Sequence, residues 1–338
     1  MRYLWLLLLA TASPCPALAQ QPETTGLSDS GPFKTEDSLE VGEEPSDDAK
    51  TCLTGLVWKK SAFTVQLEPG KNGSDFLIRF PSPKPVGNAV IDRVAVEWHM
   101  ARERDGSKKQ SALPIVIVHE LGSNMAAGRT IAKTVSRVGF HAFMVQLPTY
   151  GERRVNRRAR VTEMMQTMQQ AIADARRARD AIAVLPTVDT SHIALQGTSL
   201  GGIIAASTGA LDNGFDSVHL VLAGGDLFNL IKTGQRDTAY VRQALQRSGV
   251  TDDQLRQMTK AIEPTRIAHR LRAPHTWLYT GTSDTVIPAA SSTALAKAAK
   301  LQEAHHKKLN ANHYSGMLYL PWVVGDITTN IASLRKSE

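Results

Sequence analysis

Residues 192–208 read HIALQGTSLGGIIAAST, which joins a short apolar run to a GxSxG motif and a stretch of small residues. The run at residues 192–196 predicts a buried strand, and the small residues after the motif predict a closely packed helix. Gly197, Ser199 and Gly201 stand at the junction. In a tight strand-to-helix turn, side chains at both glycine positions would collide with the backbone. We therefore expect Ser199 on a strained turn, as a nucleophilic serine requires.

A serine hydroxyl needs a base, and the base needs an acid that orients it. Of the ten histidines, His313 is the best candidate, because it lies in a loop between the last expected strand and the final helix. Asp284 follows an expected strand at residues 275–280 and gives the chain order serine, aspartate, histidine. Asp226 is a second candidate for the acid, and its alternative role is to cap the helix that follows. The alternative to the whole assignment is an ordinary serine in a glycine-rich loop.

An attacked carbonyl also needs backbone donors for its developing negative charge. The N–H of Leu200, directly after the serine, is one candidate for this oxyanion hole. The other is the N–H of Leu121, in the loop HELGS at residues 119–123, which follows an apolar run at residues 113–119. We expect His119 itself to be structural. This chemistry requires neither a metal nor an organic cofactor.

Apolar runs alternate with helical periodicity from about residue 61 onward, which predicts an α/β fold with a parallel sheet covered on both faces. The region 226–272 contains no expected strand and predicts a helical insertion. Met164, Met165 and Met168 are expected to fill the core. The expected strands are residues 62–67, 75–80, 89–100, 113–119, 140–147, 192–196, 218–223, 275–280 and 305–309, and the expected helices are residues 128–138, 161–185, 200–211 and 289–300.

Residues 1–19 have the pattern of a secretory signal peptide: a positive start, a short apolar run and a small-x-small cleavage site at residues 17–19. We therefore expect an exported protein, periplasmic or extracellular. The alternative is a lipoprotein signal in which Cys15 carries the lipid. Cleavage after residue 19 leaves Cys52 as the only cysteine, so an internal disulfide is excluded.

Residues 20–50 carry nine acidic side chains against two lysines, which predicts a disordered acidic tether before a folded domain at residues 51–338. Since the whole chain has a net charge of +7, the folded domain is strongly basic. Its arginine-rich runs at residues 153–160 and 176–179 have no interleaved aromatic side chains. We therefore expect a solvated basic surface and no nucleic-acid partner.

Two further classes of protein are excluded by the composition. No apolar run reaches the roughly 18 residues that a membrane-spanning helix needs. Two cysteines in 338 residues cannot form a disulfide framework or a cysteine-based metal site.

The motifs together resemble the α/β-hydrolase superfamily over about residues 75–335. The similar segments are VIVHELGS at residues 116–123, GTSLG at residues 197–201, GTSDTVIP at residues 281–288 and the late His313. LPTYGERR at residues 147–154 is similar to dienelactone-hydrolase-like and acetyl-xylan-esterase-like members. The resemblance implies a mostly parallel sheet of eight strands, a Ser/Asp/His triad and a helical cap between the sixth and seventh strands.

Two positions depart from the pattern of the family. Glu120 stands where the family usually has glycine, in the loop expected to form the oxyanion hole. Ser199 stands where dienelactone hydrolases carry cysteine, which disfavours that substrate. Candidate substrate contacts are Glu120, Tyr150, Arg153 and Arg154, with the two arginines suited to a carboxylate or phosphate group.

The sequence thus predicts an exported serine esterase that cleaves a carboxylic ester through an acyl-enzyme on Ser199. The expected substrate is a small-molecule or polysaccharide-linked ester. A peptidase of the same fold is one alternative, and a non-catalytic binding protein on a hydrolase scaffold is another.

Overall fold

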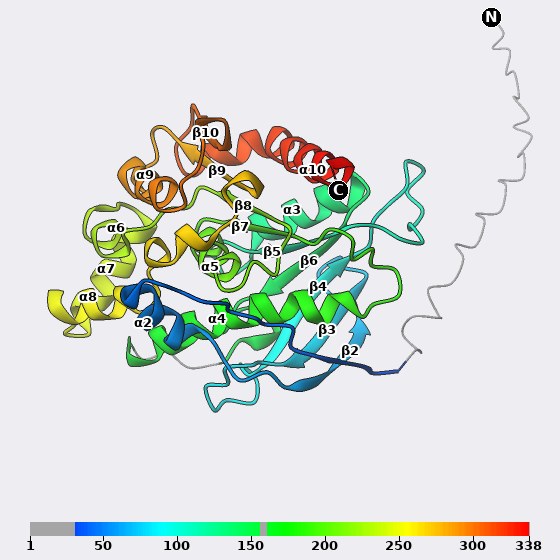
Figure 1. Cartoon of the computed structure of the whole chain (residues 1–338), viewed down its shortest axis with the longest axis horizontal. Coiled ribbons are helices and arrows are strands. Elements are labelled where there is room, and N and C mark those ends of the chain that lie inside the picture. Colours follow the sequence, from blue (N-terminus) through cyan, green and yellow to red (C-terminus); the bar gives the residue numbers. More distant parts are fainter. Residues whose placement is uncertain (1–30, 156–160, 338) are drawn as a thin grey trace, which may run out of the picture.

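A mixed sheet with helices on both faces organises the computed structural model, which describes residues 31–155 and 161–337 (Figure 1). The expected signal peptide at residues 1–19 lies outside the described residues, as do residues 20–30 of the expected tether. Within the two described ranges, no helix combines the length and the apolar character needed to cross a membrane.

The sheet has ten strands in the order β1-β2-β3-β4-β6-β5-β7-β8-β9-β10. Neighbours from β1 to β6 pair antiparallel, and those from β6 to β10 pair parallel. The strands are β1 (Phe33–Glu36), β2 (Ala62–Pro69), β3 (Phe76–Pro81), β4 (Arg93–His99), β5 (Pro114–Val118), β6 (His141–Gln146), β7 (Ala194–Thr198), β8 (Ser217–Val221), β9 (Thr276–Gly281) and β10 (His306–Leu309).

Three helices, α6, α7 and α8, follow one another between β8 and β9, in the region where the sequence predicts a helical insertion. We call these three helices the cap. The helices are α2 (Asp47–Leu56), α3 (Ala126–Arg137), α4 (Val161–Ala183), α5 (Leu200–Gly209), α6 (Leu227–Thr233), α7 (Asp237–Arg247), α8 (Asp252–Lys260), α9 (Ala289–Ala298) and α10 (Leu320–Ser337); two of the short 3₁₀ segments are η1 (Gly151–Arg153) and η6 (Ser315–Tyr319).

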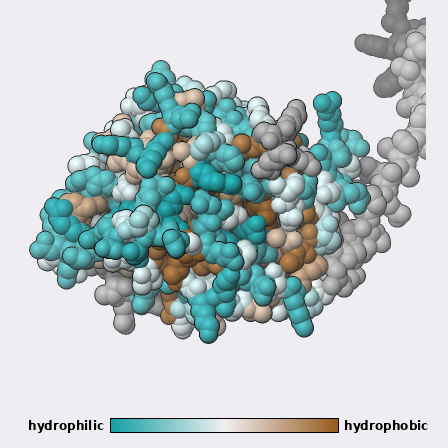
Figure 2. Space-filling view, viewed as in Figure 1, coloured by the Kyte–Doolittle hydropathy of each residue, from teal (hydrophilic) through white to brown (hydrophobic). Residues whose placement is uncertain are grey.

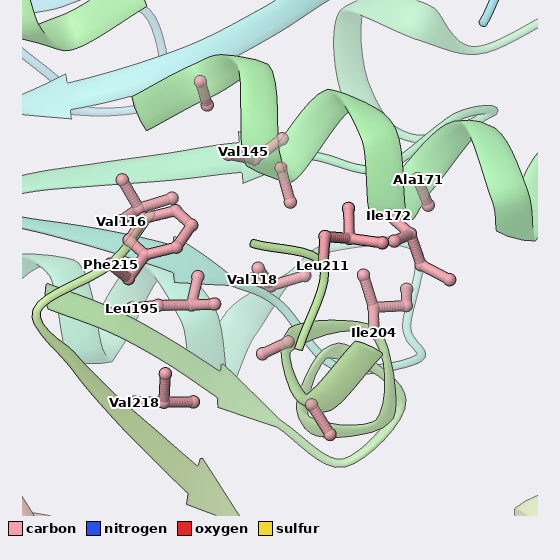
Figure 3. Close-up of a cluster of buried hydrophobic side chains, with 14 of the residues drawn as sticks. Val116, Val118, Val145, Ala171, Ile172, Leu195, Ile204, Leu211, Phe215 and Val218 are labelled. Carbon is pink, nitrogen blue, oxygen red and sulfur yellow. The ribbon is translucent and has the colours of Figure 1, made fainter. Parts of the chain in front are cut away.

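The main core lies between the parallel strands and the helices α4 and α5 (Figure 3). Val116 of β5 and Leu195 of β7 are fully buried, and they belong to the same cluster as Ile172 of α4 and Ile204 of α5. Because helices cover both faces of these strands, every residue of β5 is buried and apolar side chains follow one another without polar breaks.

The eight strands implied by the family resemblance are wrong, because the described residues form a sheet of ten. β1 and β2 extend the antiparallel edge of the sheet. β2 includes the whole expected strand at residues 62–67 and continues to Pro69. β1 was not expected, because it has only four residues and lies in the segment whose composition predicts disorder.

The expected disordered tether is corrected for residues 31–50, which are ordered against the body. We call residues 31–56 the N-terminal strap, because they contain β1 and α2. Asp37 is buried and forms an ion pair with Arg177, and the Glu44 carboxylate accepts a hydrogen bond from Arg270 Nη1 at 2.8 Å. The composition of this segment predicts disorder because it shows only the acidic side chains. The arginines that pair with them come from distant parts of the sequence and lie beside them only in the folded protein.

The arginine-rich run on α4 is also corrected, since Arg176 and Arg177 are buried rather than solvated. Arg176 Nη2 donates to Asp212 Oδ2 at 2.6 Å, and its Nη1 donates to Asp180 Oδ2 at 3.1 Å. These two arginines therefore form ion pairs inside the protein and do not contribute to a solvated basic surface. Seen from the side shown in Figure 2, the surface is mostly hydrophilic, with apolar residues between the polar ones.

Candidate active site

Ser199 occupies a strained turn between β7 and α5. Its backbone angles are φ 55° and ψ −118°, in a region that side-chain-bearing residues rarely adopt. A Cβ added at Gly197 would overlap the carbonyl oxygen of Gly201, and one added at Gly201 would overlap that of Val118. The turn therefore requires glycine at both positions, as the motif predicts.

Three side chains meet at the carboxyl edge of the sheet, where β7, β9 and β10 end. Ser199 Oγ lies 2.9 Å from His313 Nε2, and His313 Nδ1 lies 2.7 Å from Asp284 Oδ2. Because Nδ1 faces a carboxylate, it carries the ring proton and donates it, which leaves the Nε2 lone pair for the serine hydroxyl. All three side chains belong to residues at most 9% exposed, so little water competes for these hydrogen bonds.

The loops that carry the aspartate and the histidine are fixed by their own hydrogen bonds. Asp284 Oδ1 accepts from the N–H groups of Val286 and Ile287, both at 2.9 Å. Asn312 Oδ1 accepts from the N–H groups of Tyr314 and Ser315, which forms a turn around His313. Sequence reasoning missed Asn312, although the pattern Asn-x-x-Ser is a signal of such a turn.

Asp226, the alternative acid, does not approach the histidine. It holds the N-cap position of α6 with a positive φ of 54°, and its side chain makes no capping hydrogen bond. Its Oδ2 accepts from Asn229 Nδ2 at 2.8 Å instead. The structure therefore pairs Asp284, not Asp226, with His313.

The two residues expected to supply the oxyanion donors, Leu121 and Leu200, line the same cavity as Ser199. In the described part of the chain, the structure gives neither of their N–H groups an acceptor. Both groups are thus free to donate to an oxygen on a bound carbonyl.

Glu120 has a structural position rather than the expected contact with substrate. Its two carboxylate oxygens accept from the N–H groups of Ala127 and Gly128, both at 2.9 Å, in the first turn of α3. A carboxylate is stabilised there by the helix dipole. Glu120 is not among the residues that line the cavity, so its side chain leaves the oxyanion loop open.

His119 is structural, as expected. Its Nδ1 donates to the carbonyl oxygen of Glu120 at 2.7 Å, and its Nε2 accepts from the N–H of Leu147 at 3.1 Å. Burial lowers the pKa of His119, which favours the neutral ring that an accepting Nε2 requires. The ring of Tyr150 packs edge-on against it at 4.8 Å between centroids and lines the cavity.

Arg153 and Arg154 do not contact the cavity. Arg153 is fully buried, and its Nη2 donates to Asp174 Oδ2 at 2.6 Å. Its other donors reach the carbonyl oxygens of Ile91 and Gln146. Arg154 is exposed, and neither residue lines the cavity. The rest of this arginine-rich run, residues 157–160, lies outside the described residues.

A cavity of about 300 Å³ opens beside Ser199, between the cap and the start of α4. Met164, Met165 and Met168 line it, and Met165 and Met168 also pack against the main core, as expected. Sequence reasoning missed this cavity because its opposite wall comes from helices about 60 to 100 residues further along the chain.

Solved structures with similar folds include esterases and a peptidase. An acetyl xylan esterase from Paenibacillus sp. R4 has a TM-score of 0.58 and 14% identity, covering 90% of this chain and 99% of that one. Acetyl xylan esterase 1 from Thermoanaerobacterium sp. JW/SL YS485 has a TM-score of 0.56 and 11% identity, with the same coverage. A puromycin-hydrolyzing peptidase from Mycobacterium tuberculosis has a TM-score of 0.53 and 13% identity, covering 80% of this chain and 46% of that one.

These likenesses confirm the α/β-hydrolase fold. No curated protein matches the chain in sequence. The sequence profile of the dienelactone hydrolase family does match, over residues 104–317, a range that includes Leu121, Ser199, Asp284 and His313. This range is more than half of the chain, and the chain therefore belongs to the dienelactone hydrolase family.

Proposed function

We propose that the protein is a serine esterase that cleaves a carboxylic ester through an acyl-enzyme on Ser199. The observation that carries the proposal is the continuous hydrogen-bonded chain from Ser199 through His313 to Asp284, placed on a strained turn next to an apolar cavity. A serine in this setting has both a base to take its proton and a carboxylate to orient that base.

The reaction follows from these positions. His313 Nε2 takes the proton of Ser199 as its Oγ bonds to the ester carbonyl carbon, and the carbonyl oxygen becomes an oxyanion that the N–H groups of Leu121 and Leu200 stabilise. His313 then gives the proton to the leaving alcohol oxygen as the bond to carbon breaks. Water, deprotonated by His313, attacks the acyl-enzyme in the same way and releases the acid.

Labelling with a fluorophosphonate tests the activated serine. We expect one adduct, located on Ser199 by peptide mass spectrometry, and we expect it to be lost in Ser199→Ala and strongly reduced in His313→Ala. Ser191→Ala, at an exposed serine outside the site, is the matched control and should label like the parent. A folded protein that labels at another serine, or not at all, would contradict the proposal.

A second candidate is hydrolysis of amides, which the likeness to the puromycin-hydrolyzing peptidase favours. Aryl esters and aryl amides with the same acyl group separate the two reactions. Hydrolysis of the esters with no detectable hydrolysis of the amides supports the esterase. Clear hydrolysis of the amides supports the peptidase, because a serine peptidase also cleaves the more reactive aryl esters.

We also propose that the esterase is exported, either periplasmic or extracellular. The support is the signal-peptide pattern of residues 1–19. N-terminal sequencing of the exported protein should find Gln20 as its first residue. An exported chain that still begins with Met1 would contradict cleavage at this site.

A further inference from the structure

The cavity beside Ser199 has apolar walls on several sides. Its wall residues come from α4, α5, the cap and the loop after β9, and Figure 1 shows the three cap helices together at one end of the sheet. The walls include Met164 and Met168 of α4, Ile203 of α5, Leu230 of α6, Leu255 of α8 and Ile287 after β9.

Three hydroxyl groups on the walls formed by α4 and the cap are already used by the protein. Thr167 donates to the carbonyl oxygen of Glu163 at 2.7 Å, and Thr238 donates to that of Val286 at 2.8 Å. Thr259 on α8 likewise donates within its own helix. A polar group that packs against these walls would therefore lose hydrogen bonds to water without regaining them from Thr167, Thr238 or Thr259.

Among the described residues of the lining, Asp237 is the one carboxylate, and it is only partly buried. Burial and the nearby Asp237 carboxylate raise the pKa of the Tyr314 hydroxyl, and Tyr314 is 47% exposed beside His313. This places the charged group of the lining near the solvent-exposed Tyr314 ring.

The position of the cavity decides which half of an ester enters it. Ser199, Leu121 and Leu200 line the cavity, whereas His313 does not. The leaving oxygen has to lie within reach of His313 Nε2, because that nitrogen protonates it. The alcohol half therefore lies on the histidine side, and the cavity faces the acyl half.

We infer that the cavity is an acyl pocket and that the proposed esterase prefers linear apolar acyl chains of about six to ten carbons over acetyl. The expected chain length follows from the volume of the cavity. A methylene group is about as large as a water molecule, and about 300 Å³ holds about ten groups of that size. The methionine side chains are flexible enough to follow such a chain. This inference rests on the proposed function.

A series of p-nitrophenyl esters from acetate to dodecanoate tests the preference, because only the acyl group changes. We expect kcat/KM to rise by up to about fourfold for each methylene buried, to reach its maximum between hexanoate and decanoate, and to fall or level off beyond. A maximum at acetate, or equal values along the series, would overturn the inference.

Substitutions that fill the cavity test its location. Met168→Trp should lower kcat/KM for octanoate at least tenfold and leave that for acetate within about twofold. Leu230→Trp, on the opposite wall, should do the same. Gln166→Trp puts the same side chain at an exposed position of α4 and should change neither value. Equal losses for both esters in the two wall variants would overturn the assignment of the cavity to the acyl group.

Fluorophosphonate labelling of the same samples shows whether a negative result concerns the acyl preference alone or the proposed esterase activity as well. A parent protein that labels on Ser199 and hydrolyses all chain lengths equally retains the proposed function and loses the acyl preference. A parent protein that neither labels nor hydrolyses any ester loses both. A wall variant counts only if it labels with a methylphosphonate probe as fast as the parent, which shows that its active serine is intact.

Discussion

At the scale of single residues, Asp284 differs from Asp226 in how its two carboxylate oxygens are used. One oxygen accepts two backbone N–H groups and the other accepts from His313, whereas the Asp226 carboxylate contacts Asn229 on its own helix. Only Asp284 can therefore fix the tautomer of the histidine.

Replacing Asp284 by asparagine should lower kcat for ester hydrolysis by roughly 10⁴-fold, because an amide opposite Nδ1 favours the wrong tautomer of His313. Asp226→Asn is the matched control and should keep kcat within about twofold. Steady-state kinetics on one active ester measures both. Equal losses in the two variants would mean that the histidine does not depend on Asp284.

Chain order was enough to predict the three side chains that the structure brings together. Each follows an expected strand of a parallel sheet, and the carboxyl ends of such strands share one edge. The positions of Glu120 and Arg153 were not predictable in this way. Their partners are the first turn of α3 and Asp174, and only tertiary packing decides those contacts.

At the scale of elements, Arg153 ties η1 to the rest of the sheet. Its guanidinium reaches the carbonyl oxygen of Gln146 in β6, that of Ile91 before β4, and the carboxylate of Asp174 in α4. Asp174 also accepts from Ser82 Oγ at 2.5 Å. The arginine therefore acts on the stability of the fold rather than on the substrate.

Arg153→Met should destabilise the protein by about 3–5 kcal/mol, because it leaves the Asp174 carboxylate buried without its cation. Arg154→Met, at the neighbouring exposed residue, should change stability by less than about 0.5 kcal/mol. Urea unfolding curves measure both. If Arg153→Met instead raised KM for acidic esters and left stability unchanged, Arg153 would bind the substrate, as the sequence predicts.

Most elements of the parallel part of the sheet were predictable, because its strands are continuous apolar runs and its helices have clear periodicity. β1 was not, because its four residues alternate between half-buried and exposed positions in an acidic segment. Local composition cannot show that Arg177 and Arg270, far along the chain, supply the partners that order this segment.

At the scale of the whole molecule, the N-terminal strap joins segments that are far apart in the sequence. Its Asp37 pairs with Arg177 of α4, its Glu44 with Arg270, and its Asp48 with Arg266. The two latter arginines lie between the cap and β9. The acidic and basic parts of the chain therefore stabilise each other in one fold.

The strap makes the stability of the protein sensitive to acid through Glu44. Burial opposes ionisation of this carboxyl, but hydrogen bonds from Arg270, the Ser46 N–H and His269 outweigh it and lower its pKa to about 2, from an ordinary value of 4.5. A lowered pKa in the folded state means that the contribution to stability is complete above about pH 4.5. The contribution is then lost as the pH falls from 4.5 toward 2.

Glu44→Gln should therefore lower Tm at pH 7, and the difference in Tm from the parent should shrink as the pH falls from about 4.5 toward 2. Comparing the two proteins at each pH removes the effect of other carboxylates, since they titrate in both. Glu43→Gln, at the exposed neighbour, is the control and should follow the parent throughout. Thermal unfolding followed by circular dichroism gives the three curves. A difference between Glu44→Gln and the parent that stays constant from pH 7 to pH 2 would show that the ionised Glu44 carboxylate does not hold the strap to the body.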